Sequence, residues 1–274
     1  MAYDLSTVSS ERVIRPPRIV LLGVEKIGKS TFAGGSNNPI FISIKGEEGI
    51  DDIPVAKTPV CNAAKEIFGW LRSLYEDEHN YETGVIDSSS TLEKLFNAEI
   101  CAKSGASSIN EGSLAFGTGA DQALIMWETL TQWIDALRLK KNMAFILIGH
   151  VKIKRFDDPN GESFDQYQWD IHQKAANLLT RWADSILFAN TKVIVQHEKL
   201  GFHKDNVKKR GIEIVPGRRF LYTQKRPAHP GGGRGAYGRL PYELPLEWEH
   251  FQNVVSAAMQ VNQISPQSEE ATNE

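Results

Sequence analysis

The chain has 274 residues, of which 41% are hydrophobic and 24% are charged, and 31 Lys and Arg against 34 Asp and Glu give a net charge of −3. This length fits one large domain or two small ones, and the acidic balance argues against a chain that is basic throughout, as many nucleic-acid binders are. Two distant cysteines, Cys61 and Cys101, exclude a disulfide scaffold and a cysteine zinc site.

Five short apolar runs, rich in β-branched residues, predict buried strands at residues 18–22, 39–44, 84–87, 143–149 and 185–189. Residues 192–196 and 219–223 predict an antiparallel pair at one edge. Apolar residues at three-to-four spacing predict helices near 61–75, 123–137 and 175–182. Strands that alternate with helices imply parallel crossovers. We therefore predict an α/β fold, with a mostly parallel sheet flanked by helices and an antiparallel edge.

The remaining segments predict the domain organisation. Residues 1–17 form a polar lead-in, residues 18–260 a single domain, and residues 261–274 an acidic tail that we expect to be disordered. No apolar run approaches the roughly 20 residues of a membrane span, and the start has no apolar signal core, so we expect a cytoplasmic protein. Residues 199–239 hold 11 Lys and Arg against 2 Asp and Glu, so the near-neutral sum conceals a basic segment.

The first predicted strand leads into GVEKIGKS, residues 23–30, which matches the phosphate-binding pattern GxxxxGK[ST] at every fixed position. Its glycines let several backbone N–H groups point at one anion, and the following helix adds its positive end. Lys29 is suited to the β- and γ-phosphates, Ser30 to Mg²⁺ and Thr31 to the α-phosphate. The predicted nucleotide-binding residues are Gly23, Val24, Glu25, Lys26, Ile27, Gly28, Lys29, Ser30 and Thr31.

Acidic residues after two other strands complete the predicted site. Asp87 ends the third strand, where an aspartate holds Mg²⁺ through water, although a strand-end aspartate also serves as a plain turn or cap residue. Three serines follow Asp87, so a carboxylate that activates water must come from elsewhere in the chain, or there is none. Glu47 and Glu48 follow the second strand, whose carboxyl end faces the same edge of a parallel sheet.

The order of these features resembles the RecA/RadA recombinase core. The similarity is closer to the short RecA-like ATP-binding proteins of phages, including the Sak-type single-strand annealing proteins. It covers residues 18–228. The segments that carry it are GVEKIGKSTFA, IFISIKGEEGIDDIP, GVIDSSSTLEKL, ILIGHVKIKRFDDP, YQWDIHQKAANLLTRWADSILFAN and FLYTQKRPA.

The resemblance implies a role for several residues of an ATP hydrolase with bound ATP and Mg²⁺. Glu47 stands at the catalytic glutamate, with Glu48 as the alternative. His150, at the end of the fourth strand, stands at the γ-phosphate sensor, although a hydrogen-bonded structural histidine is the simpler interpretation. Lys225 and Arg226 stand where basic residues reach the neighbouring subunit's γ-phosphate in trans.

The resemblance also implies partners. Loops at residues 104–119 and 151–169 stand where recombinases hold single-stranded DNA. The second carries Lys152, Lys154, Arg155 and Phe156, a mixture of cations and an aromatic ring that suits a strand, although nearby acids also fit a solvated loop. We expect a DNA-stimulated ATPase that assembles as a ring or filament and promotes annealing or strand exchange. It would be phage-encoded, act in the bacterial host cytoplasm and be assisted by a single-strand-binding protein.

Two other functions fit the phosphate-binding loop. A P-loop kinase or nucleotide switch would use the basic segment after Lys199 as a lid over an acceptor pocket. A DNA motor ATPase would share the same loop, but the sequence has no obvious nuclease or helicase motif.

Overall fold

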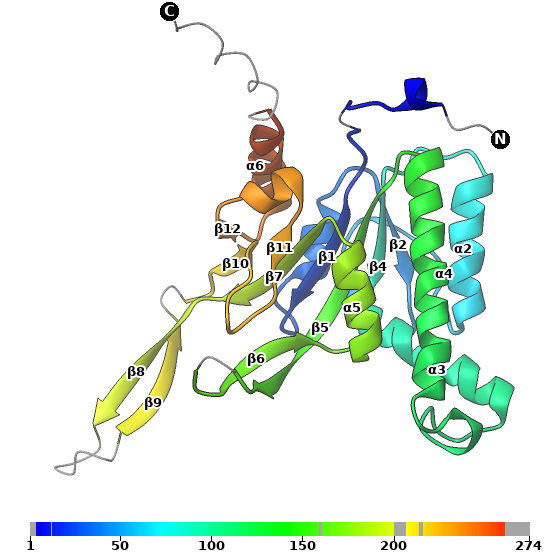
Figure 1. Ribbon diagram of the computed structural model, residues 1–274. Coiled ribbons are helices and arrows are strands. Elements are labelled where there is room, and N and C mark those ends of the chain that lie inside the picture. The colour runs from blue at the N-terminus through cyan, green and yellow to red at the C-terminus, as the bar shows by residue number, and fades with distance from the viewer. Residues whose placement is uncertain (1–3, 12, 159–160, 200–206, 214–215, 261–274) are drawn as a thin grey trace, which may run out of the picture.

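A mostly parallel sheet with helices on both faces forms the body of the protein (Figure 1). The computed structural model describes residues 4–11, 13–158, 161–199, 207–213 and 216–260. The predicted acidic tail lies outside the described residues, as does part of the basic segment. The predicted fold class, a parallel α/β sheet with flanking helices and an antiparallel edge, is confirmed.

The main sheet contains eight strands along one path, in the order β12-β10-β7-β1-β5-β4-β2-β3. Neighbouring strands from β7 to β3 are parallel, whereas β10 and β12 are antiparallel. The strands are β1 (Arg18–Gly23), β2 (Pro39–Ser43), β3 (Ala56–Lys57), β4 (Thr83–Asp87), β5 (Ala144–Phe156), β6 (Phe164–Trp169), β7 (Ser185–Thr191), β8 (Val193–Lys199), β9 (Val207–Glu213), β10 (Arg219–Tyr222), β11 (Gly232–Gly233) and β12 (Glu243–Pro245).

Six α-helices accompany the described strands: α1 (Lys29–Gly34), α2 (Ala64–Glu76), α3 (Ser89–Ser104), α4 (Thr118–Lys140), α5 (Gln173–Trp182) and α6 (Trp248–Gln260). The helices predicted from three-to-four spacing correspond to α2, α4 and α5. Short 3₁₀ turns lie at Leu5–Thr7, Glu48–Ile50, Gly112–Leu114 and Gly235–Arg239.

The two faces of the sheet pack against different helices, which explains why the central strands are apolar throughout. In β1, Val20 and Leu22 belong to the core shared with α2, α3, α4 and α5. Ile19 and Leu21 belong to the opposite core, shared with α1 and α6. Alternate side chains of a strand point to opposite faces, so a strand covered on both sides needs apolar residues at every position.

The register of the sheet brings the predicted site residues to one edge. Gly23 at the end of β1 pairs with His150 in β5. Ser43 at the end of β2 pairs with Asp87 at the end of β4. Because these strands are parallel, their carboxyl ends meet on the same side of the sheet, where open α/β sheets bind ligands.

The prediction that residues 151–169 form a loop is wrong in part, because most of this segment forms a β-hairpin. β5 continues through Phe156 and pairs with β6 antiparallel, from Val151 opposite Trp169 to Phe156 opposite Phe164. Val151, Trp169 and Tyr167 pack against the body, and Lys152 and Lys154 lie on the opposite face of this two-stranded ribbon. Arg155 falls on the same face as Val151. The mixed charges concealed this period-two pattern.

The predicted pairing of residues 192–196 with 219–223 is also wrong. β8 pairs with β9 in a separate hairpin, and β10 pairs with β7 instead. Figure 1 shows β8 and β9 extending away from the main sheet. The antiparallel edge exists, but its strands are β10 and β12 rather than the pair expected.

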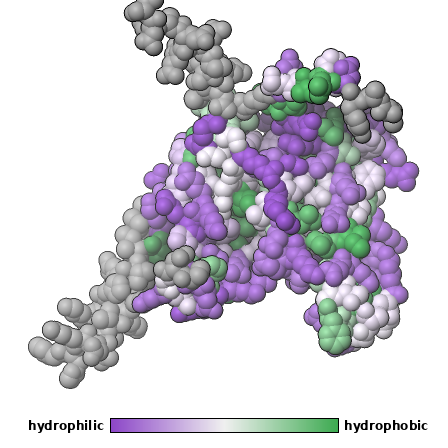
Figure 2. All heavy atoms as spheres, viewed as in Figure 1, coloured by the Kyte–Doolittle hydropathy of each residue, from purple (hydrophilic) through white to green (hydrophobic). Residues whose placement is uncertain are grey.

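The face of the molecule shown in Figure 2 has no extended apolar patch among the coloured residues. Figure 2 shows that the face seen in Figure 1 is mainly hydrophilic, with apolar residues in small separate groups. Within the described part of the chain, no helix is both long and apolar enough to cross a membrane.

Candidate active site

The phosphate-binding loop joins the buried strand β1 to helix α1. Gly28 precedes the helix with a φ of 101°, a left-handed conformation that favours glycine. Gly23 lies so close to β7 that a Cβ atom there would be 2.5 Å from the carbonyl oxygen of Ala189. Both glycines are therefore required by the backbone, and the loop presents the first N–H groups of α1 to the cleft.

Lys29 is buried beneath this loop with only 6% of its surface exposed. Its ammonium group donates to the carbonyl oxygens of Gly23 at 3.0 Å and Val24 at 2.8 Å. Burial lowers the pKa of Lys29, although Asp87 and Glu47 oppose this through their negative charge. The cation is thus held at the loop by groups that a phosphate oxygen is able to replace.

Ser30 and Asp87 come together across the sheet edge. The Ser30 hydroxyl donates to Oδ2 of Asp87 at 2.5 Å, and burial raises the pKa of Asp87 despite that hydrogen bond. A hydroxyl and a carboxylate are oxygen ligands of the kind that Mg²⁺ prefers. No cluster of three or more His, Cys, Asp or Glu occurs among the described residues. The pair therefore suits Mg²⁺, which binds few protein groups together with phosphate and water.

Glu47 is fixed by hydrogen bonds to one of its two carboxylate oxygens. Oε1 accepts from Ser88 Oγ at 2.5 Å, from Thr91 Oγ1 and from His150 Nε2 at 3.3 Å. Burial alone would raise the pKa of Glu47, but these hydrogen bonds from His150, Ser88 and Thr91 outweigh it and lower the pKa to about 2. The carboxylate is therefore charged and oriented at neutral pH.

His150 occupies the position expected for the sensor, at the point where β5 leaves the sheet. A carboxylate only accepts hydrogen bonds, so His150 carries a proton on Nε2. Its Nδ1 is buried without a partner in the described part of the chain. The histidine thus contacts the candidate base directly. Glu48 begins the 3₁₀ turn after Glu47, and its side chain lies outside what the structure describes.

A cleft of about 690 Å³ connects these groups. Asp87, Glu47 and His150 line it together with six of the nine predicted loop residues: Glu25, Lys26, Gly28, Lys29, Ser30 and Thr31. Gly23, Val24 and Ile27 do not line it. The cleft also contains residues that the sequence did not predict: Ser90, Thr91, Lys94, Asp170 and Arg219. Ser88 is the N-cap of α3 and Thr91 lies in its first turn, and this helix N-terminus favours a nearby carboxylate. In the sequence, the three serines that follow Asp87 were the feature from which hydroxyl groups at this site could have been predicted.

The predicted trans residues lie elsewhere. Lys225 and Arg226 are exposed, and neither lines the cleft of its own chain. The Arg226 guanidinium lies 4.3 Å from the ring centroid of Tyr242. Their distance from the cleft is compatible with action on a neighbouring chain and equally with a surface role.

The predicted DNA-binding residues lie on the β5–β6 hairpin. Lys152 pairs with Asp170 at 2.8 Å, at the base of the hairpin beside the cleft. Lys154 and Arg155 are exposed farther along β5, and Phe156 lies beside Phe164 with ring centroids 5.3 Å apart and ring planes tilted by 47°. The hairpin is anchored to the body by Trp169, whose indole N–H donates to Ser89 at 2.9 Å. The expected cations and ring therefore share one ribbon.

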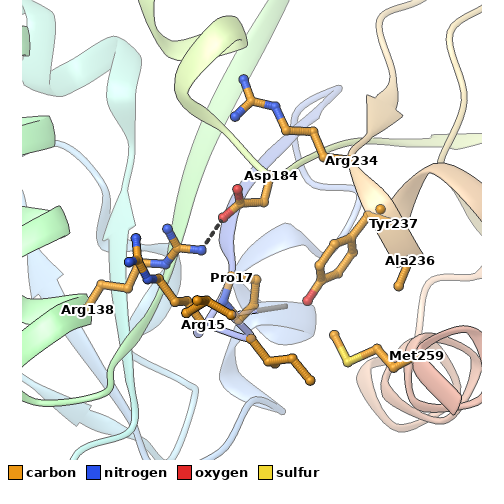
Figure 3. A pocket seen from close by; sticks show the side chains of 11 residues that line it. Arg15, Pro17, Arg138, Asp184, Arg234, Ala236, Tyr237 and Met259 are labelled. Carbon is orange, nitrogen blue, oxygen red and sulfur yellow. Dashed lines mark hydrogen bonds and ion pairs between the residues drawn. The ribbon is translucent and has the colours of Figure 1, made fainter. Parts of the chain in front are cut away.

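A second cavity, of about 400 Å³, lies at the opposite, amino ends of β1 and β7 (Figure 3). Asp184 lines this cavity and forms ion pairs with Arg18 and Arg138, both at 2.9 Å. These contacts join the start of β1 and the end of α4 to the residue before β7. The cavity lies away from the carboxyl ends of the strands, so we place the active site in the first cleft.

Comparison with known proteins agrees with a nucleotide-binding site. The family model described as "AAA domain" matches residues 15–235. A solved structure, the crystal structure of the RadB recombinase, is similar over 79% of this chain and 84% of that chain, with 14% sequence identity and a TM-score of 0.40. The search of curated proteins found no match.

Proposed function

Because the chain belongs to the AAA domain family, we propose that it is a Mg²⁺-dependent, RecA-like ATPase that acts on single-stranded DNA. The single observation that supports hydrolysis most strongly is the oriented carboxylate of Glu47. It lies in the same cleft as the Lys29 loop and the Ser30–Asp87 pair. In this proposal residues 18–260 form the ATPase domain.

In the proposed mechanism each side chain has one task. Lys29 and the N–H groups of the loop bind the β- and γ-phosphates. Ser30 and Asp87 would hold a magnesium ion, Asp87 through water, and the bound ion would supply positive charge to neutralise the phosphates. Glu47 orients the attacking water rather than removing its proton early, since a carboxylate with a pKa of about 2 is a weak base. Phosphoryl transfer needs mainly such positioning.

The DNA part of the proposal rests on the hairpin. The exposed Lys154 and Arg155 supply cations for phosphates, and Phe156, which is 37% exposed, supplies a ring for base stacking. His150 and these residues belong to the same strand, β5. A change around the γ-phosphate therefore has a short covalent route to the DNA-binding residues.

The assembly part of the proposal rests on the exposed Lys225 and Arg226. They would complete the cleft of a neighbouring chain in a homo-oligomeric ring or filament. We further propose that the oligomer promotes annealing or strand exchange in the cytoplasm of a phage-infected host, with help from a single-strand-binding protein.

The decisive experiment measures ATP turnover with and without single-stranded DNA, together with the size of the protein in the presence of ATP and Mg²⁺. We expect turnover to rise with DNA and the protein to be oligomeric. A Lys29→Ala variant should bind and hydrolyse ATP poorly in both conditions. A monomer with no DNA retention and no stimulation would contradict the DNA proposal, and phosphate transfer to a small acceptor would favour a kinase.

A further inference from the structure

Arg219 reaches the phosphate-binding loop from the far side of β1. It begins β10, where it pairs with Thr191 of β7, and its carbonyl oxygen accepts from the N–H of Leu246 at 3.2 Å. Neighbouring strands on both sides therefore fix its backbone. Its side chain lines the same cleft as Lys29, Asp87 and Glu47.

The guanidinium lies directly against Gly28. A Cβ atom on Gly28 would be 2.8 Å from Nη1 of Arg219 and 3.9 Å from its Cδ. The missing side chain at Gly28 thus leaves room for the arginine as well as permitting the positive φ. Arg219 is exposed, and its contact with Gly28 places a solvent-accessible cation beside the backbone N–H groups of the loop, where an anion would bind.

Within the described part of the chain, no carboxylate forms an ion pair with this cation. Three of the four carboxylates that line the cleft contact other groups: Asp87 with Ser30, Glu47 with His150, and Asp170 with Lys152. The fourth, Glu25, is exposed. The adjacent Arg218 differs, because its guanidinium lies 5.5 Å from the ring centroid of Phe220 and it does not line the cleft.

We propose that Arg219 binds the phosphate chain of the nucleotide held by the loop of its own chain. This inference rests on the proposed function, since it assumes a nucleotide at the loop. A guanidinium presents a planar pair of N–H donors that matches two phosphate oxygens, and it stays charged at any physiological pH. Arg219 would therefore act in cis, in contrast to the trans role proposed for Lys225 and Arg226.

Nucleotide affinity tests the proposal. ATP and inorganic tripolyphosphate, which has no base or sugar, would be titrated into the full-length protein and its Arg219→Ala variant. We expect the substitution to weaken both by a similar factor of about ten or more, as loss of a charge-assisted hydrogen bond predicts. Arg219→Lys should recover part of the loss. The midpoint of thermal unfolding without ligand should not change.

Arg218→Ala is the matched control, since it removes the same charge one residue away and should keep the wild-type affinity within about twofold, as expected for an exposed charge. Equal affinities of Arg219→Ala and wild type would overturn the inference. So would a loss for ATP without a loss for tripolyphosphate, which would place the guanidinium on the base. If the wild type binds neither ligand, the proposed function itself fails, and the two failures are distinguishable.

Discussion

At the scale of single residues, the hydrogen bonds around Glu47 have two effects: they keep its carboxylate charged, and they fix its orientation. Ser88, Thr91 and His150 all donate to Oε1. Such saturation of one oxygen fixes the plane of the carboxylate and leaves Oε2 as its other acceptor. The same hydrogen bonds make the group a weak base, so its contribution lies in the direction of a hydrogen bond to water.

Glu47→Gln should retain ATP binding and lower turnover by roughly 100-fold or more, the usual contribution of a catalytic acid or base. Because the pKa of Glu47 is about 2, its charge is unchanged between pH 5 and pH 9, so wild-type turnover should not follow a Glu47 titration there. Steady-state rates across this range provide the measurement. Glu48→Gln is the control; if it abolishes turnover while Glu47→Gln does not, the assignment is reversed.

Replacement of Asp87 should stabilise the fold and abolish activity. Burial raises its pKa, so protonation favours the folded state, and this advantage is lost as pH rises through the folded pKa. At neutral pH the ionised, buried side chain therefore costs stability. Asp87→Asn should increase the free energy of unfolding by about 1 kcal/mol without ligand and abolish Mg²⁺-dependent turnover. Chemical denaturation at pH 7 checks this; a less stable variant would contradict it.

The residues that sequence could predict are those defined by chain-local patterns. Gly28, Lys29 and Ser30 are specified by a fixed spacing, and Asp87 by its place at a strand end. Thr91 and Arg219 carry no such pattern. They reach the cleft only through the position of α3 after β4 and the pairing of β10 with β7, both of which are long-range properties of the fold.

At the scale of elements, the β5–β6 hairpin gives the DNA proposal a quantitative test. Lys154→Ala should weaken single-stranded DNA binding and reduce the slope of log K against log salt by roughly 0.7. Phe156→Ala should weaken binding by about 1–3 kcal/mol through lost stacking while leaving the salt slope unchanged. Fluorescence titrations at several salt concentrations separate the two effects.

Lys103→Ala is the control for this pair, because Lys103 is an exposed lysine on α3 that is paired with Glu99 at 2.6 Å. It should leave affinity and slope unchanged. Equal effects of Lys103→Ala and Lys154→Ala would indicate general charge attraction and would count against a specific role for the hairpin.

The central strands were predictable, whereas the pairing of the peripheral strands was not, for a physical reason. A strand buried on both faces is apolar at every position, which makes β1 and β4 visible in the sequence. β8 and β10 were predicted as strands, but their partners, β9 and β7, depend on long-range contacts that neither strand's own residues specify. Helix α3 was not predicted, although its buried Leu92, Phe96 and Ile100 follow the four-residue spacing of a helix.

At the scale of the whole molecule, the proposed trans contacts predict complementation between inactive chains. Lys29→Ala and a Lys225→Ala/Arg226→Ala double variant should each be inactive alone. Mixed together they should regain turnover, because the first supplies intact basic residues to the intact cleft of the second. ATPase assays of mixtures at constant total protein measure this. No recovery would contradict action in trans.

Strand β5 joins the cleft at His150 to the β5–β6 hairpin, so its packing limits which movements could pass from the cleft to the hairpin. Its first half is hydrogen-bonded to β1 and β4, and its second half forms the hairpin. Sliding by one residue would move every side chain to the wrong face. At Gly149 even a Cβ atom would come within 2.4 Å of the Trp169 indole nitrogen. These contacts exclude translation of β5 along its own axis. The proposed nucleotide turnover would therefore act on the hairpin through a change in the bend or twist of β5 beyond His150.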